Sequence, residues 1–165
     1  MDAKLDKVKA RYPSKTLSSK SLLKFVYEKA LPTIGVKDMY TKEYYNNVKG
    51  PTVYVFLDTE KAKNEAGYKY VTSRLSKLVA KFPGQFVYTL VNRKEDETDF
   101  REYEFPSHLH SKKGDVTVGL KVQDTVYTML KPFSFDHLVE FIEEYKKDTL
   151  VGRPAMVSER EVYFL

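Results

Sequence analysis

The pattern of apolar and polar positions is strongest between Thr52 and Asn92. Within it, apolar residues recur at steps of three and four over residues 65–82, which predicts an amphipathic helix with one buried face. The members of this stripe are Tyr68, Val71, Leu75, Leu78, Val79 and Phe82. The flanking runs, Thr52 to Asp58 and Phe86 to Val91, are rich in β-branched and aromatic residues, as in parallel strands covered on both faces. A central βαβ unit is therefore predicted.

Weaker patterns on both sides of this unit predict the remaining elements. Ser18 or Ser19 is expected to cap a helix that ends at Pro32, and a short strand over residues 32–36 and a short helix over residues 40–48 follow. After the unit we expect a helical turn around residues 100–105, a hairpin of residues 116–120 and 125–129, and a final helix capped by Ser134. A βαβ half followed by a ββα half predicts an α/β, thioredoxin-like fold, with a central mixed sheet of about five strands flanked by helices.

A length of 165 residues suits one domain with tails. We expect a basic flexible segment over residues 1–17, the thioredoxin-like domain over residues 18–148, and a linker over residues 149–165 that leads to a following domain if the parent chain is longer. The sequence has no apolar run of 18 residues and no secretory leader at Met1, so no membrane span is expected.

The net charge of +5 comes from the N-terminal third of the chain. Residues 1–50 hold eleven Lys or Arg against five Asp or Glu, and the other 115 residues hold 17 against 18. Such a balance favours anionic partners, and an alternative function is therefore a basic module that binds nucleic acid or an anionic surface. This alternative ranks lower, because no aromatic platform for single strands is evident and charged tails are commonly just solvated.

The residues that most catalytic and metal sites need are missing. The chain has no cysteine, which excludes disulfides, thiolate metal sites and cysteine nucleophiles. His108 and His110 lie two residues apart but lack an obvious third ligand, and the carboxylates of residues 95–104 lack the spacing of a calcium loop. The histidines are interpreted as surface residues, and the carboxylates as the solvated acidic start of a helix. No catalytic residue, no metal site and no cofactor is predicted.

Several short motifs follow one another in a particular order and spacing from about Leu22 to Val157. They are Leu23-Lys-Phe-Val26, Leu31-Pro-Thr-Ile-Gly35, Val53-Tyr-Val-Phe56, Gly67-Tyr-Lys-Tyr-Val71, Asn92-Arg-Lys94, Gly114-Asp-Val116 and Phe135 to Phe141. In this order they resemble the non-catalytic, thioredoxin-like b′ domains of the protein disulfide isomerase family. The resemblance is strongest to two endoplasmic reticulum members, one with three catalytic domains and one that works with calnexin and calreticulin.

The resemblance implies a module of the endoplasmic reticulum lumen that supports oxidative folding by binding unfolded or misfolded clients or a co-chaperone. The Cys-x-x-Cys of a catalytic thioredoxin domain would stand at the start of the helix after the second strand. Ala62-Lys-Asn-Glu65 occupies that region here, and this departure suits a binding domain.

The resemblance also implies two binding sites. The apolar client site would lie between the segment after the first strand and the segment after the third. Its residues would be Met39, Tyr40, Tyr44, Tyr45, Phe100 and Tyr103. Tyrosine and methionine suit adaptable apolar contacts, but rings at this spacing equally often cover a sheet, and both interpretations stay open.

The second implied site is electrostatic. In the calnexin-associated relatives, basic residues bind the acidic arm of calnexin or calreticulin. Lys24 and Arg93 occupy two of these basic positions, whereas Gln85 stands where a third lysine would be. The sequence therefore keeps part of the expected basic cluster, and each isolated exposed charge is worth only about 0–1 kcal/mol.

Overall fold

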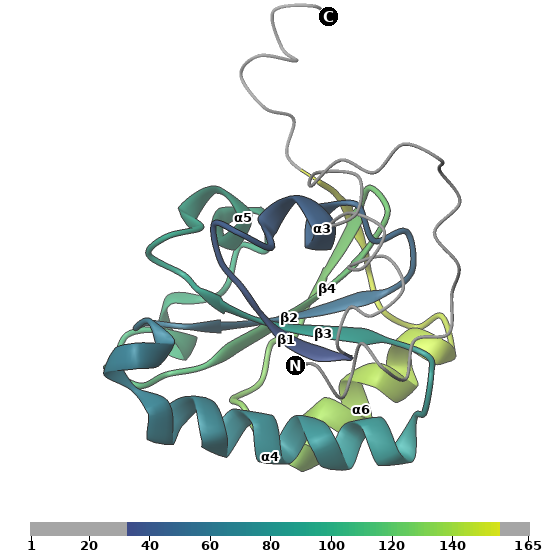
Figure 1. Ribbon diagram of the computed structural model, residues 1–165. Helices are drawn as coiled ribbons and strands as arrows, with labels where there is room; N and C mark the ends of the chain where they lie inside the picture. Colours follow the sequence, from purple (N-terminus) through teal and green to yellow (C-terminus); the bar gives the residue numbers. More distant parts are fainter. Residues whose placement is uncertain (1–32, 156–165) are drawn as a thin grey trace, which may run out of the picture.

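The computed structural model describes residues 33–155, which form a mixed sheet with helices on both faces (Figure 1). In chain order the elements are β1 (Ile34–Lys37), α3 (Lys42–Asn46), β2 (Thr52–Leu57), a 3₁₀ turn (Lys61–Lys63), α4 (Glu65–Lys81), β3 (Val87–Asn92), α5 (Glu97–Glu102), a second 3₁₀ turn (Ser107–Leu109), β4 (Thr117–Val122), β5 (Thr125–Thr128), α6 (Phe135–Lys146) and β6 (Arg153–Pro154). The helix predicted after Ser18 or Ser19 lies outside the described residues.

The sheet has the strand order β1-β3-β2-β4-β5-β6. Strand β3 pairs in parallel with both β1 and β2, whereas β4 pairs antiparallel with β2 and β5. The predicted βαβ unit, the hairpin and the thioredoxin-like topology are therefore confirmed, with strand ends shifted by one or two residues. The sheet has six strands rather than about five.

The sixth strand comes from the segment that the sequence predicts as a linker. Arg153 and Pro154 pair with β5, and the amide of Ala155 donates to the carbonyl of Asp124 at 2.7 Å. The nearby glycine and proline are typical linker residues, but an edge strand tolerates proline because one side needs no hydrogen bond. The guanidinium of Arg153 donates to the carbonyl of Tyr103 at 2.5 Å and so fastens the end of α5 to this edge.

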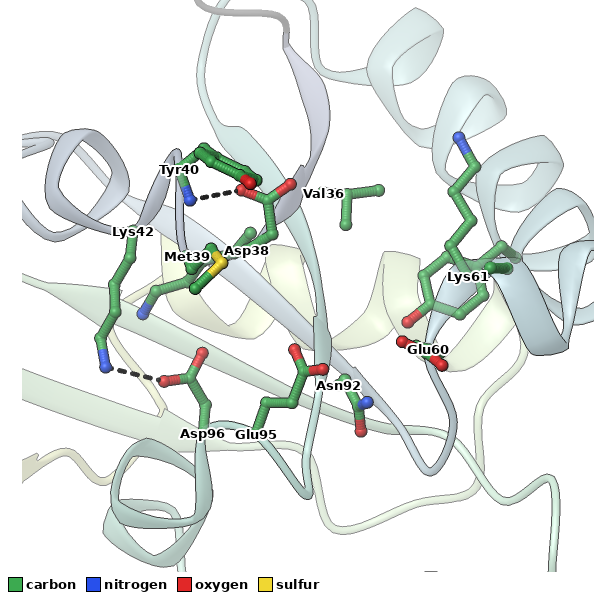
Figure 2. A pocket seen from close by; sticks show the side chains of 13 residues that line it. Val36, Asp38, Met39, Tyr40, Lys42, Glu60, Lys61, Asn92, Glu95 and Asp96 are labelled. Carbon is green, nitrogen blue, oxygen red and sulfur yellow. Dashed lines mark hydrogen bonds and ion pairs between the residues drawn. The ribbon is translucent and has the colours of Figure 1, made fainter.

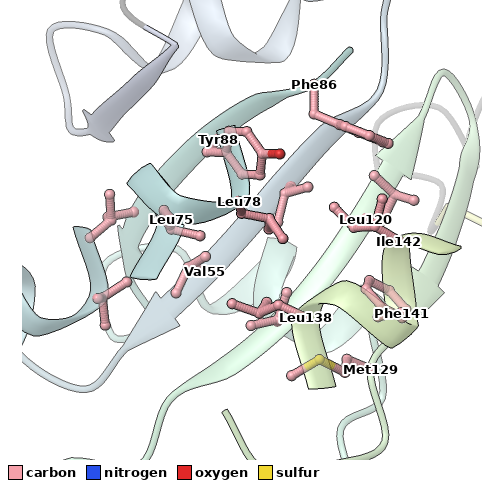
Figure 3. Packing of buried hydrophobic residues seen from close by; sticks show 14 of the residues in the cluster. Val55, Leu75, Leu78, Phe86, Tyr88, Leu120, Met129, Leu138, Phe141 and Ile142 are labelled. Atoms are coloured by element: carbon pink, nitrogen blue, oxygen red, sulfur yellow. The ribbon is translucent and has the colours of Figure 1, made fainter. Parts of the chain in front are cut away.

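The larger core lies between the sheet and the helices α4 and α6, which cover the same face (Figures 1 and 3). Asn64 caps α4 by accepting the amide of Gly67 at 3.0 Å, and Ser134 caps α6 as predicted. In this core, the apolar stripes of both helices pack against alternate residues of the strands. The residues of this core that have no exposed surface are Val53, Val55, Val71, Leu75, Leu78, Val118, Leu120, Leu138 and Ile142. The helical stripe predicted along residues 65–82 is confirmed.

The opposite face of the sheet carries a smaller aromatic cluster. It consists of Tyr54, Phe56, Val91, Tyr103, Phe105 and Val126, with Phe100 packed against it. The ring of Tyr103 lies directly on the backbone of β4, because a Cβ atom added to Gly119 would come within 2.3 Å of that ring. Gly119 is thus required by the close approach of Tyr103, not by a turn.

We predict that Gly119→Ala lowers the free energy of unfolding by about 2 kcal/mol, because a buried ring cannot move away from the new methyl group. Gly50→Ala is the matched control, since a Cβ atom there meets nothing within 4 Å. Chemical denaturation of both variants measures the effect. Equal stability of the two variants would show that Tyr103 does not pack on β4 as described.

Candidate functional site

A cleft of about 650 Å³ opens at the carboxyl ends of the three parallel strands. Its walls come from residues 36–42 after β1, residues 60–62 with Tyr68 around the start of α4, and residues 92–96 after β3 (Figure 2). Parallel strands leave their carboxyl ends at one edge of a sheet, where ligands of α/β proteins commonly bind. This position makes the cleft the leading candidate site among the described residues.

The wall after β1 presents two large apolar side chains to solvent. Met39 is 81% exposed and Tyr40 is 78% exposed. The reason is a tight turn held by Asp38, whose carboxylate accepts the amides of Tyr40 at 2.9 Å and Thr41 at 3.0 Å. The hydroxyl of Thr41 donates to the carbonyl of Val36 at 3.0 Å and closes the turn. The turn therefore holds Met39 and Tyr40 out of the core.

Two ion pairs join this wall to the wall after β3. The ammonium of Lys37 lies 2.7 Å from the Asp99 carboxylate on α5, and the Lys37 side chain is 0% exposed. The Lys37 ammonium also lies 5.2 Å from the centre of the Tyr54 ring. Lys42 and Asp96 form the second pair at 3.2 Å. Lys37 thus links the segment after β1 to α5, and Lys42 links it to the wall after β3.

The floor of the cleft, at the start of α4, contains Glu60, Lys61 and the buried Tyr68. The Tyr68 hydroxyl donates to the carbonyl of Thr59 at 2.8 Å. Burial, together with the nearby carboxylates of Glu95, Glu60 and Asp58, raises the pKa of this hydroxyl to about 12. The start of α4, where a catalytic thioredoxin domain would carry its dithiol, thus presents Glu60 and Lys61 to the cleft and no thiol.

The contacts between α5 and the sheet also involve buried polar groups. Burial raises the pKa of Glu102 above its usual range, and the ammonium of Lys121 opposes this effect from 3.5 Å. Burial likewise raises the pKa of the Tyr54 and Tyr103 hydroxyls. The Tyr103 hydroxyl has no hydrogen-bond partner among the described residues. These groups position α5 and lie behind the cleft wall, not on its surface.

The six residues predicted for the apolar client site fall in different environments. Met39 and Tyr40 line the cleft and are exposed. Tyr44 and Phe100 are half-buried, whereas Tyr45 and Tyr103 are buried. The structure therefore brings two of the six to the cleft and places Tyr103 in the core below α5. Client binding itself stays a prediction.

The cleft contains residues that sequence reasoning did not select. Glu60, Glu95 and Asp96 line it together with Asp38. A pattern in the sequence could have indicated these residues, because a carboxylate follows shortly after the end of each predicted parallel strand. Glu95 and Asp96 were included only in an acidic run that was interpreted as solvated.

The residues predicted for the basic site are not seen together in the structure. Lys24 lies outside the described residues. The guanidinium of Arg93 donates to the carbonyl of His110 at 3.2 Å and lies 5.8 Å from the centre of the Phe100 ring. Gln85 lies at the opposite end of β3 from Arg93. Arg93 thus holds the segment after α5 against the sheet.

The two histidines that were considered as metal ligands lie near this segment. The Nε2 atom of His110 lies 3.2 Å from the carbonyl oxygen of Phe105, and its ring packs edge-on against Phe100. Within residues 33–155, no group of three or more histidine, aspartate or glutamate side chains is arranged to hold a metal ion. No helix in that range is both long and apolar enough to cross a membrane.

Comparison with known proteins identifies the fold independently. Residues 3–144 match the family model of the thioredoxin-like domain. Among solved structures, the bb fragment of ERp72 superposes with a TM-score of 0.63 at 16% sequence identity, covering 88% of this chain and 66% of that fragment. Human ERp44 superposes with a TM-score of 0.53 at 9% identity, covering 82% of this chain and 36% of that protein. Comparison with curated proteins gives no match.

We predict that the two partners of the buried ion pair differ in their contribution to stability. Asp99→Asn should cost about 3 kcal/mol, because it leaves the ammonium of Lys37 buried without its counter-charge. Lys37→Met should cost less, about 1 kcal/mol, because Asp99 is 27% exposed and water can solvate it. Thermal and chemical unfolding of both variants measure the difference. A larger cost for Lys37→Met would contradict the described burial of this pair.

Proposed function

This chain belongs to the family of thioredoxin-like domains, and from this premise we propose that it is a non-catalytic, client-binding domain of a protein disulfide isomerase in the endoplasmic reticulum lumen. The order of its sequence motifs supports this assignment, as does its likeness in fold to the bb fragment of ERp72. The chain spans 66% of that fragment and 36% of human ERp44, so its role is proposed for the domain alone.

The observation that carries the proposal is the cleft with Met39 and Tyr40 exposed on its wall. A tyrosine brings a large ring with a polar end, and a methionine adapts its shape to irregular apolar partners. Unfolded proteins expose apolar side chains of many shapes, and an adaptable surface suits them better than a rigid pocket. The ion pairs of Lys37 and Lys42 link the segment that carries Met39 and Tyr40 to α5 and to the wall after β3.

Capture of a client by this chain is non-covalent. Because the sequence has no cysteine, the chain cannot form a mixed disulfide with a client. The thiol chemistry of the proposed parent protein would belong to other domains, and this domain would hold the client beside them.

Binding of the acidic arm of calnexin or calreticulin is a second, separate prediction. It requires Lys24, which lies outside the described residues, and Arg93, which is half-buried and already contacts His110 and Phe100. An acidic partner would have to compete with these contacts for the guanidinium. We therefore assign client binding first. The alternative of a nucleic-acid or anionic-surface module rests mainly on residues that precede the described part of the chain.

We predict that the double variant Met39→Ser/Tyr40→Ser weakens binding of a labelled unfolded polypeptide about tenfold, because two large apolar side chains are lost from the cleft. Leu130→Ser is the matched control, since Leu130 is 64% exposed and does not line the cleft. Fluorescence anisotropy with a reduced, alkylated protein as client gives the dissociation constants, and circular dichroism verifies folding.

Two outcomes would overturn the proposal. One is that no unfolded polypeptide binds to the unmodified chain. The other is that Leu130→Ser weakens binding as much as the double variant does, since the surface that binds clients would then lie elsewhere.

A further inference from the structure

The charge of the cleft identifies the class of client segment that it accepts. We infer that the cleft prefers segments in which an apolar side chain is adjacent to a lysine or an arginine. The inference rests on the proposed client-binding function and extends it to the chemistry of the ligand. It follows from the arrangement of carboxylates and lysines around the cleft.

Carboxylates from all three walls surround the hollow (Figure 2). Asp38 follows β1, Glu60 precedes α4, and Glu95 and Asp96 follow β3. In Figure 2 the carboxylate of Glu95 lies between those of Asp96 and Glu60, facing Asp38 and Met39 across the space. A cation entering the hollow would therefore meet carboxylates from several sides, of which Asp96 and Glu60 are paired with lysines.

Lysines neutralise only part of this charge, and Glu60 is paired with Lys63 at 3.3 Å. Lys37 is buried and paired with Asp99, and Lys42 is paired with Asp96. Figure 2 shows the ammonium of Lys61 pointing away from the carboxylates.

Two of the carboxylates have no ion-pair partner among the described residues. Glu95 is exposed, and no cationic side chain of the described residues lies within ion-pair distance of it. Asp38 accepts only from neutral donors, the amides of Tyr40 and Thr41. An exposed carboxylate beside an apolar wall is the complement of a basic side chain.

The buried Tyr68 lies in the floor, close to several carboxylates. Its hydroxyl pKa is raised by burial and then by Glu95, Glu60 and Asp58, which all disfavour a negative charge at this position.

A basic residue fits the mixed chemistry of these walls. The stem of lysine or arginine is apolar and its tip is charged, so the stem can lie along Met39 while the tip reaches Glu95. The neighbouring apolar residue of the client would contact Tyr40. A segment with aspartate or glutamate in the same place would be repelled.

The test compares three labelled peptides of equal length that share one tyrosine and leucine core. The flanking residues are arginine in the first, glutamine in the second and glutamate in the third. Fluorescence anisotropy in low salt should give an affinity for the arginine peptide about tenfold above that for the glutamate peptide, and added salt should reduce this difference.

Variants of Glu95 connect the preference to the cleft. Glu95→Gln should weaken binding of the arginine peptide about threefold and leave the glutamine peptide unchanged, and Glu95→Lys should weaken it about tenfold. Glu97→Gln is the matched control, because Glu97 lies on α5, pairs with Arg101 and does not line the cleft. It should change none of the affinities.

The outcomes separate the inference from the function on which it rests. Equal binding of the three peptides, or equal effects of the variants at Glu95 and Glu97, would overturn the inference and leave client binding intact. Absence of binding for all three peptides would contradict both the inference and the proposed client binding. A dimer that dissociates on Glu95→Lys would assign the cleft to the basic part of a second copy, and would overturn the inference as well.

Discussion

The buried ion pair between Lys37 and Asp99 is the interaction on which the site depends. A lysine with no exposed surface at the end of β1 is costly to desolvate, and the Asp99 carboxylate at 2.7 Å and the Tyr54 ring offset that cost. The same contact fixes α5 over the sheet. It thereby sets the positions of Phe100 and Tyr103 in the aromatic cluster and of the acidic residues that precede α5.

The start of α4 shows how a shared fold serves a different purpose. The positive end of a helix dipole stabilises negative charge, which in a catalytic thioredoxin domain is a thiolate. Here the same end lies beside the carboxylates of Glu60 and Glu95, and no sulfur is present. The helix end that would activate a nucleophile instead lines the candidate cleft. Non-covalent recognition of a basic, apolar segment is the function that this arrangement supports.

Much of the fold was predictable because its periodicities are strong. The stripe from Tyr68 to Phe82 and the alternation along residues 52–57 specify the βαβ unit, and Ser134 marks the start of α6. Strand β6 was not predictable, since two residues carry no periodicity and their pairing depends on the edge that β5 offers.

The site was predictable only in part. Aromatic residues at helical spacing look alike whether they cover a sheet or face solvent, so Tyr40 and Tyr45 could not be distinguished before the turn at Asp38 was seen. The group of carboxylates in the cleft was missed because its members come from three separate segments. Only the order of the parallel strands brings these segments together.

Mapping of backbone amide resonances by NMR tests the central claim most directly. On titration with the arginine-flanked peptide, we predict that the shifted amides cluster at residues 37–42, 60–62 and 92–96, which are the three walls of the cleft. Residues on the outer surfaces of α4 and α6 should remain unchanged. Shifts confined to α6 and the β5–β6 edge, with none around Met39 and Glu95, would contradict the account.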